Sequence, residues 1–163
     1  MSFLILGSDP PLVDAIVSTL VADGDLVRVV DPDPSRVEAI KQRGGFVASG
    51  NPADADLVER AGQGARTAVV VEPAPLTAEV LGALVAARIS RIVYVGRDAN
   101  TIKLISAGTL DHVVLRRRRA TLRRTGEISS IVAAVVAADD LAGTPRVVVD
   151  LSDKSALEML LGG

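Results

Sequence analysis

The sequence predicts one α/β domain of the Rossmann-like type, with a doubly wound parallel sheet. Short runs rich in Val and Ile alternate with amphipathic segments of helical length, and nearly every residue in the runs is apolar. Strands that are apolar on both faces are covered by helices on both faces, and helical crossovers between them make the sheet parallel. The chain has 163 residues, of which 48% are hydrophobic, enough for one large core and short for two domains.

Strands and helices are expected to alternate through the first 115 residues. The expected strands are Phe3–Leu6, Leu26–Val30, Phe46–Ala48, Thr67–Val71, Arg91–Val95 and His112–Leu115. The expected helices cover residues 11–22, 34–43, 53–61, 76–88 and 98–107. Glycine is the commonest residue just past the end of a helix, and four of these helices should stop at Gly24, Gly44, Gly62 and Gly108.

The pattern changes after Leu115. An arginine run leads into an Ala/Val-rich helix, expected from Glu127 to Leu141. A strand at Arg146–Asp150 and a short helix at Lys154–Leu161 follow. We expect residues 1–115 to form the Rossmann-like part and residues 116–163 to complete the same domain.

The helix after the arginine run is apolar nearly all round between Ile128 and Ala138. Such a helix must be buried, either against its own sheet or between two subunits. Its alanines permit close helix approach, which favours a symmetric pairing of two copies. We therefore expect a homodimer formed through this helix, with packing on its own sheet as the alternative.

Composition excludes several classes of protein. The chain has no cysteine and one histidine, so it offers no disulfide, no thiolate nucleophile and no multi-histidine metal centre. One Tyr, two Phe and no Trp are too few for a platform that stacks nucleic-acid bases, and the net charge is −2. No apolar stretch approaches the ~20 residues that span a bilayer, and no basic leader begins the chain. We expect a cytoplasmic protein that neither spans the membrane nor binds nucleic acid or metal.

The first strand, turn and helix have the frame of a dinucleotide site. Gly7 stands at the first position of the G-x-G-x-x-G pattern, and Asp31 ends the second strand, where an acid binds ribose hydroxyls. Asp9 and Leu12 replace the second and third glycines, and an aspartate beside two phosphates should repel them. Two interpretations stay open: a working nucleotide site that includes Gly7, Ser8 and Asp31, or a turn glycine with a capping acid.

No catalytic constellation stands out. Tyr94 is followed four residues later by Asp98 instead of the lysine of a Tyr-x-x-x-Lys pair. Asp111-His112 has no serine or cysteine nucleophile to accompany it, and the sequence contains neither G-x-S-x-G nor the phosphate-binding loop G-x-x-x-x-G-K-[ST]. The sequence alone therefore predicts that the protein is not an enzyme.

The most unusual local feature is a cluster of six arginines in nine residues. It follows the sixth expected strand, so it should emerge at the carboxyl edge of the sheet, where ligands bind in such folds. A solvated loop, a surface for an acidic partner or anionic lipid, and a clamp for a small anion all stay open. The residues concerned are Arg116, Arg117, Arg118, Arg119, Arg123 and Arg124.

Four segments together give a family resemblance. They are Leu4–Gly7, the acidic Pro-containing stretch Val29–Val37, Gly50-Asn51-Pro52, and Asp56–Gly62. In this order they resemble the TrkA-N domain, also called the N-lobe of RCK (regulator of potassium conductance) proteins. The resemblance runs from Phe3 to about Leu115 and continues loosely through the helix at 127–141, which lies where the family has a crossover helix used in pairing.

The resemblance implies specific roles. Gly7 matches the first glycine of the fingerprint, Asp31 the ribose acid, and Asn51 a position near the adenine that is usually an aspartate. It implies a non-catalytic regulatory module that binds NAD or another adenine nucleotide and acts on a membrane potassium transporter or channel. A degenerate scaffold that assembles without a nucleotide is the alternative, and an NAD-dependent oxidoreductase is the third interpretation.

Overall fold

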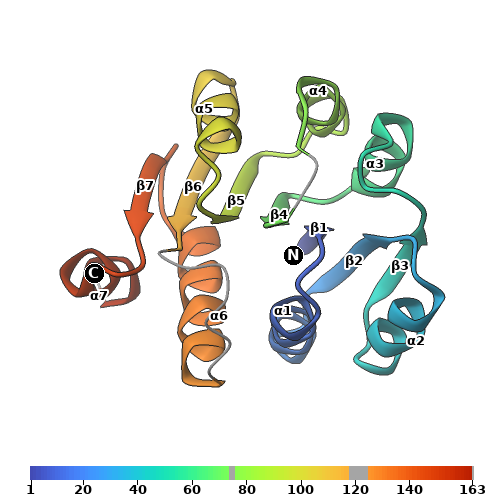
Figure 1. Ribbon diagram of the computed structural model, residues 1–163, viewed down its shortest axis with the longest axis horizontal. Helices are drawn as coiled ribbons and strands as arrows, with labels where there is room; N and C mark the ends of the chain where they lie inside the picture. Colours follow the sequence, from blue (N-terminus) through green and yellow to red (C-terminus); the bar gives the residue numbers. More distant parts are fainter. Residues whose placement is uncertain (74–75, 118–124, 163) are drawn as a thin grey trace.

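The computed structural model describes residues 1–73, 76–117 and 125–162, and within them the chain forms one parallel sheet between two layers of helices (Figure 1). The strand order is β3-β2-β1-β4-β5-β6-β7, and every neighbouring pair is parallel. The strands are β1 (Ser2–Gly7), β2 (Leu26–Asp31), β3 (Phe46–Ser49), β4 (Thr67–Val71), β5 (Arg91–Gly96), β6 (Asp111–Arg116) and β7 (Arg146–Asp150).

Helices cover both faces of the sheet. In Figure 1, α3, α4 and α5 lie above the strands, α1, α2 and α6 lie below them, and α7 lies at the β7 end. The helices are α1 (Pro10–Ala22), α2 (Pro34–Gln42), α3 (Ala55–Gly62), α4 (Ala78–Ala86), α5 (Ala99–Ala107), α6 (Thr125–Asp140) and α7 (Lys154–Gly162). The predicted Rossmann-like class, with its C-terminal helix, strand and short helix, is confirmed.

The core has two halves, one on each side of the sheet. Alternate residues of β1 show this, because Phe3 and Ile5 pack with α1 and α6, whereas Leu4 and Leu6 pack with α3 and α4. All four side chains are buried. An unbroken apolar strand is therefore what this position in the fold requires, since a polar residue on either face would be buried without a partner.

The long helix α6 is buried by its own sheet. Ile131, Val135 and Ala138 are at most 3% exposed and belong to the same core cluster as α1 and β6. Most of its apolar side chains are therefore covered within the chain, as in the alternative that it packs on its own sheet, whereas a homodimer through this helix stays a prediction. Its small alanines allow α6 to approach α1 closely.

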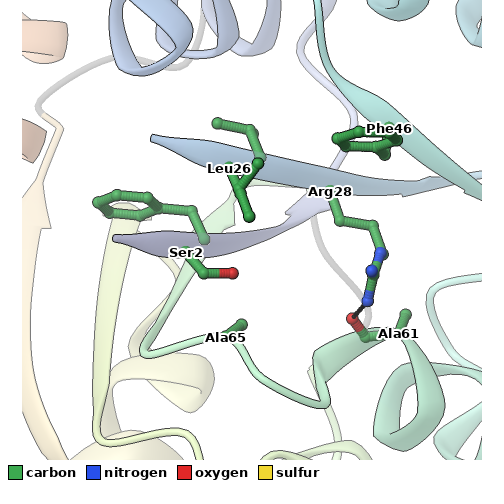
Figure 2. Close-up of a pocket in the computed structure, with 8 residues that line it drawn as sticks. Ser2, Leu26, Arg28, Phe46, Ala61 and Ala65 are labelled. Carbon is green, nitrogen blue, oxygen red and sulfur yellow. Dashed lines mark hydrogen bonds between the residues drawn. The ribbon is translucent and has the colours of Figure 1, made fainter. Parts of the chain in front are cut away.

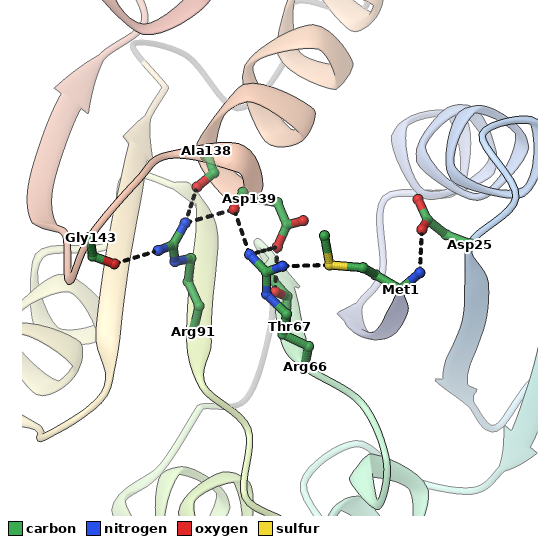
Figure 3. Close-up of polar contacts among 8 residues, drawn as sticks. All are labelled: Met1, Asp25, Arg66, Thr67, Arg91, Ala138, Asp139 and Gly143. Carbon is green, nitrogen blue, oxygen red and sulfur yellow. Dashed lines mark hydrogen bonds and ion pairs between the residues drawn. The ribbon is translucent and has the colours of Figure 1, made fainter.

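Polar contacts anchor the end of α6 to the sheet (Figure 3). Arg91, which is 5% exposed, donates to the carbonyl oxygens of Ala138, Asp139 and Gly143 at 3.0, 2.7 and 3.2 Å. The Thr67 hydroxyl donates to the Asp139 carboxylate. Carbonyl groups at a helix C-terminus lack partners within the helix, so this guanidinium acts as the cap of α6.

The chain reverses its winding at β1, which is hydrogen-bonded to β2 on one side and to β4 on the other. Crossovers on the two sides of this point leave a crevice at the carboxyl ends of the strands, where open α/β sheets bind ligands. Within the described residues, no helix is both long and apolar enough to cross a bilayer.

Candidate functional site

A cavity of about 310 Å³ lies at the carboxyl ends of β1 and β2, beside the switch point. Ligand sites commonly enclose ~300–1,000 Å³. The crevice is therefore at the lower end of that range, a size that suits one part of a dinucleotide. Its lining residues are Gly7, Ser8, Pro10, Val30, Asp31, Pro32, Asp33, Arg36 and Pro52.

Gly7 forms the tight turn that closes one end of the crevice. Its φ is +116°, a conformation that L residues rarely adopt, and an added Cβ would lie 1.9 Å from the carbonyl oxygen of Val71 in β4. No other residue fits here without moving β1 away from β4. The prediction of Gly7 as a turn glycine is thus explained by the close approach of two strands, with Ser8 exposed just beyond it.

Asp31 ends β2 and is 8% exposed. Its Oδ1 accepts the backbone N–H of Asp33 at 2.9 Å, which fixes the carboxylate against the turn into α2. Among the described residues no hydrogen bond reaches its Oδ2. This carboxylate is fixed on the wall of the cavity and has one oxygen without a partner. It can therefore accept hydrogen bonds from the hydroxyl groups of a ribose.

Two further charged residues of α2 and its cap line the crevice. Asp33 caps α2, and the backbone N–H of Ser35 is the main cause that lowers the pKa of the Asp33 carboxyl below its usual value. Arg36 donates through both terminal nitrogens to the Asp14 carboxylate, once at 3.2 Å and once more closely. The crevice therefore presents two carboxylates and a guanidinium that is already paired.

Asp9 does not line the crevice. Its Oδ2 accepts from Arg117 Nη1 at 3.2 Å, and both side chains are less than a tenth exposed. The Arg117 backbone N–H in turn donates to the Gly96 carbonyl at 3.0 Å. The expectation that Asp9 repels phosphates must be corrected, because its charge is paired inside the protein.

The start of α1 still departs from a usual pyrophosphate site. Helix N-termini bind anions through backbone N–H groups that lack partners in the helix. Here the first two helical positions are Pro10 and Pro11, which have no N–H, and the Asp9 side chain makes no cap hydrogen bond. The Asp31 carboxylate fits the ribose of a nucleotide, whereas α1 offers few donors to its phosphates.

The remaining predicted site residues do not come together. Asn51 is exposed, lies outside the cavity lining, and accepts the Ala53 N–H at 2.9 Å as a turn residue. Arg116 is half exposed and donates to Asp150 at 2.9 Å, whereas Arg117 is buried on Asp9. The other predicted arginines lie outside the described residues, namely Arg118, Arg119, Arg123 and Arg124.

Sequence reasoning missed Arg36 and the partner of Asp9. Arg36 lies in the first turn of α2, two residues past the predicted helix start, so its position at the crevice was open to prediction. A charged residue in place of the second fingerprint glycine also signals a counter-charge. Nothing in the sequence, however, indicates that the counter-charge is 108 residues away.

A second cavity, of about 210 Å³, lies at the opposite, amino-terminal ends of β1 and β2 (Figure 2). Apolar side chains predominate in its lining, with Leu26 and Phe46 partly open to solvent. Arg28 reaches across it to donate to the Ala61 carbonyl at 2.6 Å. None of the predicted site residues lies in this cavity.

Several solved structures with the same fold are described as reductases or oxidoreductases. Anaerobilin reductase ChuY from Escherichia coli O157:H7 is 15% identical, with a TM-score of 0.69 over 91% of this chain and 95% of that one. The NADPH-dependent quinone oxidoreductase QOR2 from E. coli is 16% identical, with a TM-score of 0.73 over 93% of this chain and 68% of that one. Triphenylmethane reductase from Citrobacter sp., complexed with NADP(H), is 14% identical, with a TM-score of 0.71 over 93% of this chain and 70% of that one. At these identities the likeness establishes the fold.

These similarities contradict the prediction of a non-catalytic regulator of potassium transport, its scaffold alternative, and the prediction that the protein is not an enzyme. Those predictions relied on missing acid–base residues. Hydride chemistry is carried by the nicotinamide cofactor, so the missing side-chain pair does not exclude a reductase. A cytoplasmic location and a transporter or channel partner stay predictions.

The sequence comparison identifies a family. A search against curated proteins found no match. The TrkA-N domain model, by contrast, matches residues 12–116, more than half of the chain, and confirms the resemblance seen in the sequence. The chain belongs to the TrkA-N domain family.

Proposed function

We propose that this chain is the nucleotide-binding domain of an NAD(H)-dependent reductase, with the adenosine ribose of the cofactor held by Asp31. The observation that carries the proposal is the fixed, mostly buried carboxylate of Asp31 on the wall of the 310 Å³ crevice beside Gly7. The structures that share the fold include a quinone oxidoreductase that depends on NADPH and a dye reductase complexed with NADP(H).

The charges of the crevice favour NAD(H) over NADP(H). The 2′-phosphate of NADP would lie near the ribose acid, where Asp31 and Asp33 both present negative charge. Arg36 is the cation in the cavity lining, and its two terminal nitrogens are held by Asp14. Like charges so close together oppose binding, so a phosphate would need Arg36 to leave its partner.

The chain's own residues would bind and orient the cofactor. The bound nicotinamide would supply the hydride. Gly7 allows the tight turn at one end of the crevice, and Asp31 would fix the ribose. Tyr94 is 1% exposed and does not line the crevice, so it is not placed to give a proton to a substrate there. The proton that accompanies the hydride would come from solvent.

The experiment is a calorimetric titration with NADH and NADPH, followed by an assay of NADH oxidation. Wild-type protein is expected to bind NADH at least about tenfold more tightly than NADPH, and Asp31→Asn to lose most of that binding. The matched control is Asp23→Asn, an exposed acid at the far end of α1 that should bind like wild type. Absence of binding to both nucleotides would refute the proposal.

Turnover tests the reductase part separately. Quinones, triphenylmethane dyes and anaerobilin are the substrates named for the similar proteins, and at least one of them should accelerate NADH oxidation. This rate should fall in Asp31→Asn and persist in Asp23→Asn. Tight NADH binding without turnover on any acceptor class would keep the cofactor assignment and reject the reductase.

A further inference from the structure

The end strand β7 leaves an apolar edge of the sheet open. It is the last strand in the order, and in Figure 1 it lies at the left margin of the sheet. Val147 and Val148 are 40% and 49% exposed, unusually high for valines in a strand. An open strand edge is a template for another strand, and proteins commonly blunt it with proline, lysine or a bulge. The five residues of β7 include no proline, and its two charged residues, Arg146 and Asp150, stand at its ends.

The backbone groups that point outward can be identified from the pairing with β6. The carbonyl of Pro145 accepts from His112, and the N–H of Leu151 donates to Arg116, so the odd-numbered residues face β6. Because successive residues of a strand alternate, Arg146, Val148 and Asp150 direct their N–H and C=O groups to the open edge. Among the described strands, none pairs with this edge.

The sequence of β7, Arg-Val-Val-Val-Asp, is complementary in charge to its own reverse. If a second β7 ran antiparallel with the two-fold axis at Val148, Arg146 of one copy would lie opposite Asp150 of the other. The two-fold axis generates this Arg146–Asp150 pair twice, once on each side of a central pair of Val148 residues. Each of the three pairs would exchange two hydrogen bonds through its outward-pointing N–H and C=O groups. Opposite charges directly across two strands stabilise pairing.

We propose that β7 is a dimerisation edge, to which a second copy of this chain adds its own β7 in antiparallel orientation. Two seven-stranded sheets would then join into one continuous sheet. The charge complementarity of Arg146 and Asp150 selects this occupant and this register. This interface differs from the one expected at α6, most of whose apolar side chains pack within the chain.

Neighbouring features support the same surface. None of the α7 side chains is fully buried, and its Met159 and Leu161 are 75% and 46% exposed. A two-fold axis normal to the sheet keeps the two copies of α7 on the same face, beside the joined strands. Asp150 would be charged in the interface, because hydrogen bonds from Ser152 and Arg116 hold its pKa well below the usual range.

The first test is the oligomeric state by analytical ultracentrifugation up to roughly 100 μM protein. The wild type is expected to sediment as a dimer. Val148→Pro removes one outward N–H from each copy and none that pairs with β6, so it should give a folded monomer. A monomeric wild type, or a dimer that survives Val148→Pro, would overturn the proposal.

The second test uses charge reversal and mixing. Arg146→Asp and Asp150→Arg should each be monomeric, because each places like charges opposite one another. An equimolar mixture of the two variants should recover dimers, since the introduced aspartate then faces the introduced arginine and the two unchanged residues also face each other with opposite charges. Lys103→Asp, an exposed reversal on α5, is the control and should stay dimeric. Folded single variants that do not recover dimers on mixing would reject this register.

Discussion

Arg117 and Asp9 are 108 residues apart in the sequence and form an ion pair, at 3.2 Å, that joins the end of β6 to the start of α1. Both side chains are at least nine-tenths buried, and Arg117 Nε has no hydrogen-bond partner among the described residues. The aspartate that replaces a fingerprint glycine is thus neutralised by a buried arginine and does not present its charge to the crevice.

Removing one partner of this pair should be costly. Arg117→Met would leave the Asp9 carboxylate buried without a counter-charge, so we expect the free energy of unfolding to fall by about 3–5 kcal/mol. Urea denaturation followed by circular dichroism measures the change. Asp9→Asn combined with Arg117→Met should recover part of the loss, and a double variant as unstable as the sum of the single ones would contradict a direct coupling.

Gly7 should tolerate no side chain. Gly7→Ala combines a positive φ with a Cβ only 1.9 Å from the Val71 oxygen, and we expect a loss of more than about 2 kcal/mol in stability. Gly64→Ala is the matched control, because Gly64 has a φ of +83° but nothing within 4 Å of an added Cβ. It should lose only about 1 kcal/mol from backbone strain. Equal losses in the two variants would show that the clash with β4 is relieved easily.

Tyr94 should contribute to a loss of stability at alkaline pH. Burial, aided by the negative charge of Glu72, raises its pKa from 10.0 to about 12. Its contribution to stability is therefore complete below pH 10 and is lost as the pH rises from 10 toward 12, because only the unfolded state ionises readily there. Since the chain has one Tyr and no Trp, phenolate absorbance reports this residue alone. A midpoint near 10 in the folded protein would contradict its burial.

Arg91 should hold the end of α6 in place. Arg91→Leu leaves the carbonyls of Ala138 and Asp139 without their guanidinium partner, so we expect a loss of about 2–4 kcal/mol, measured by urea denaturation. Arg43 is the matched control: it donates to a carbonyl near the end of α2 at 3.1 Å, but its side chain is 38% exposed. Arg43→Leu should cost less than about 1 kcal/mol. Similar costs at both positions would argue against burial as the source of the difference.

The sequence is informative where a residue's role depends on its neighbours along the chain. The strands were predictable because successive residues such as Leu4 and Ile5 face opposite sides of the sheet and are both apolar. Asp31 was predictable because it stands at the end of such an apolar run. The sequence is uninformative where a residue's role depends on a segment far away along the chain. The apolar circumference of α6 indicates burial, but not whether its own sheet or a second subunit provides it. The pairing of Arg117 with Asp9 likewise depends on the folded sheet.

The central position of β1 has a consequence for how the chain folds. β1 leads the described sequence, yet its second neighbour is β4, with Phe3 paired to Thr67. During synthesis β1 and β2 emerge with one side of β1 still open until β4 has left the ribosome. Non-local parallel pairing of this kind is slow and exposes apolar strands in the meantime. The strand that ends at Gly7 therefore depends on protection until β4 is available to pair with it.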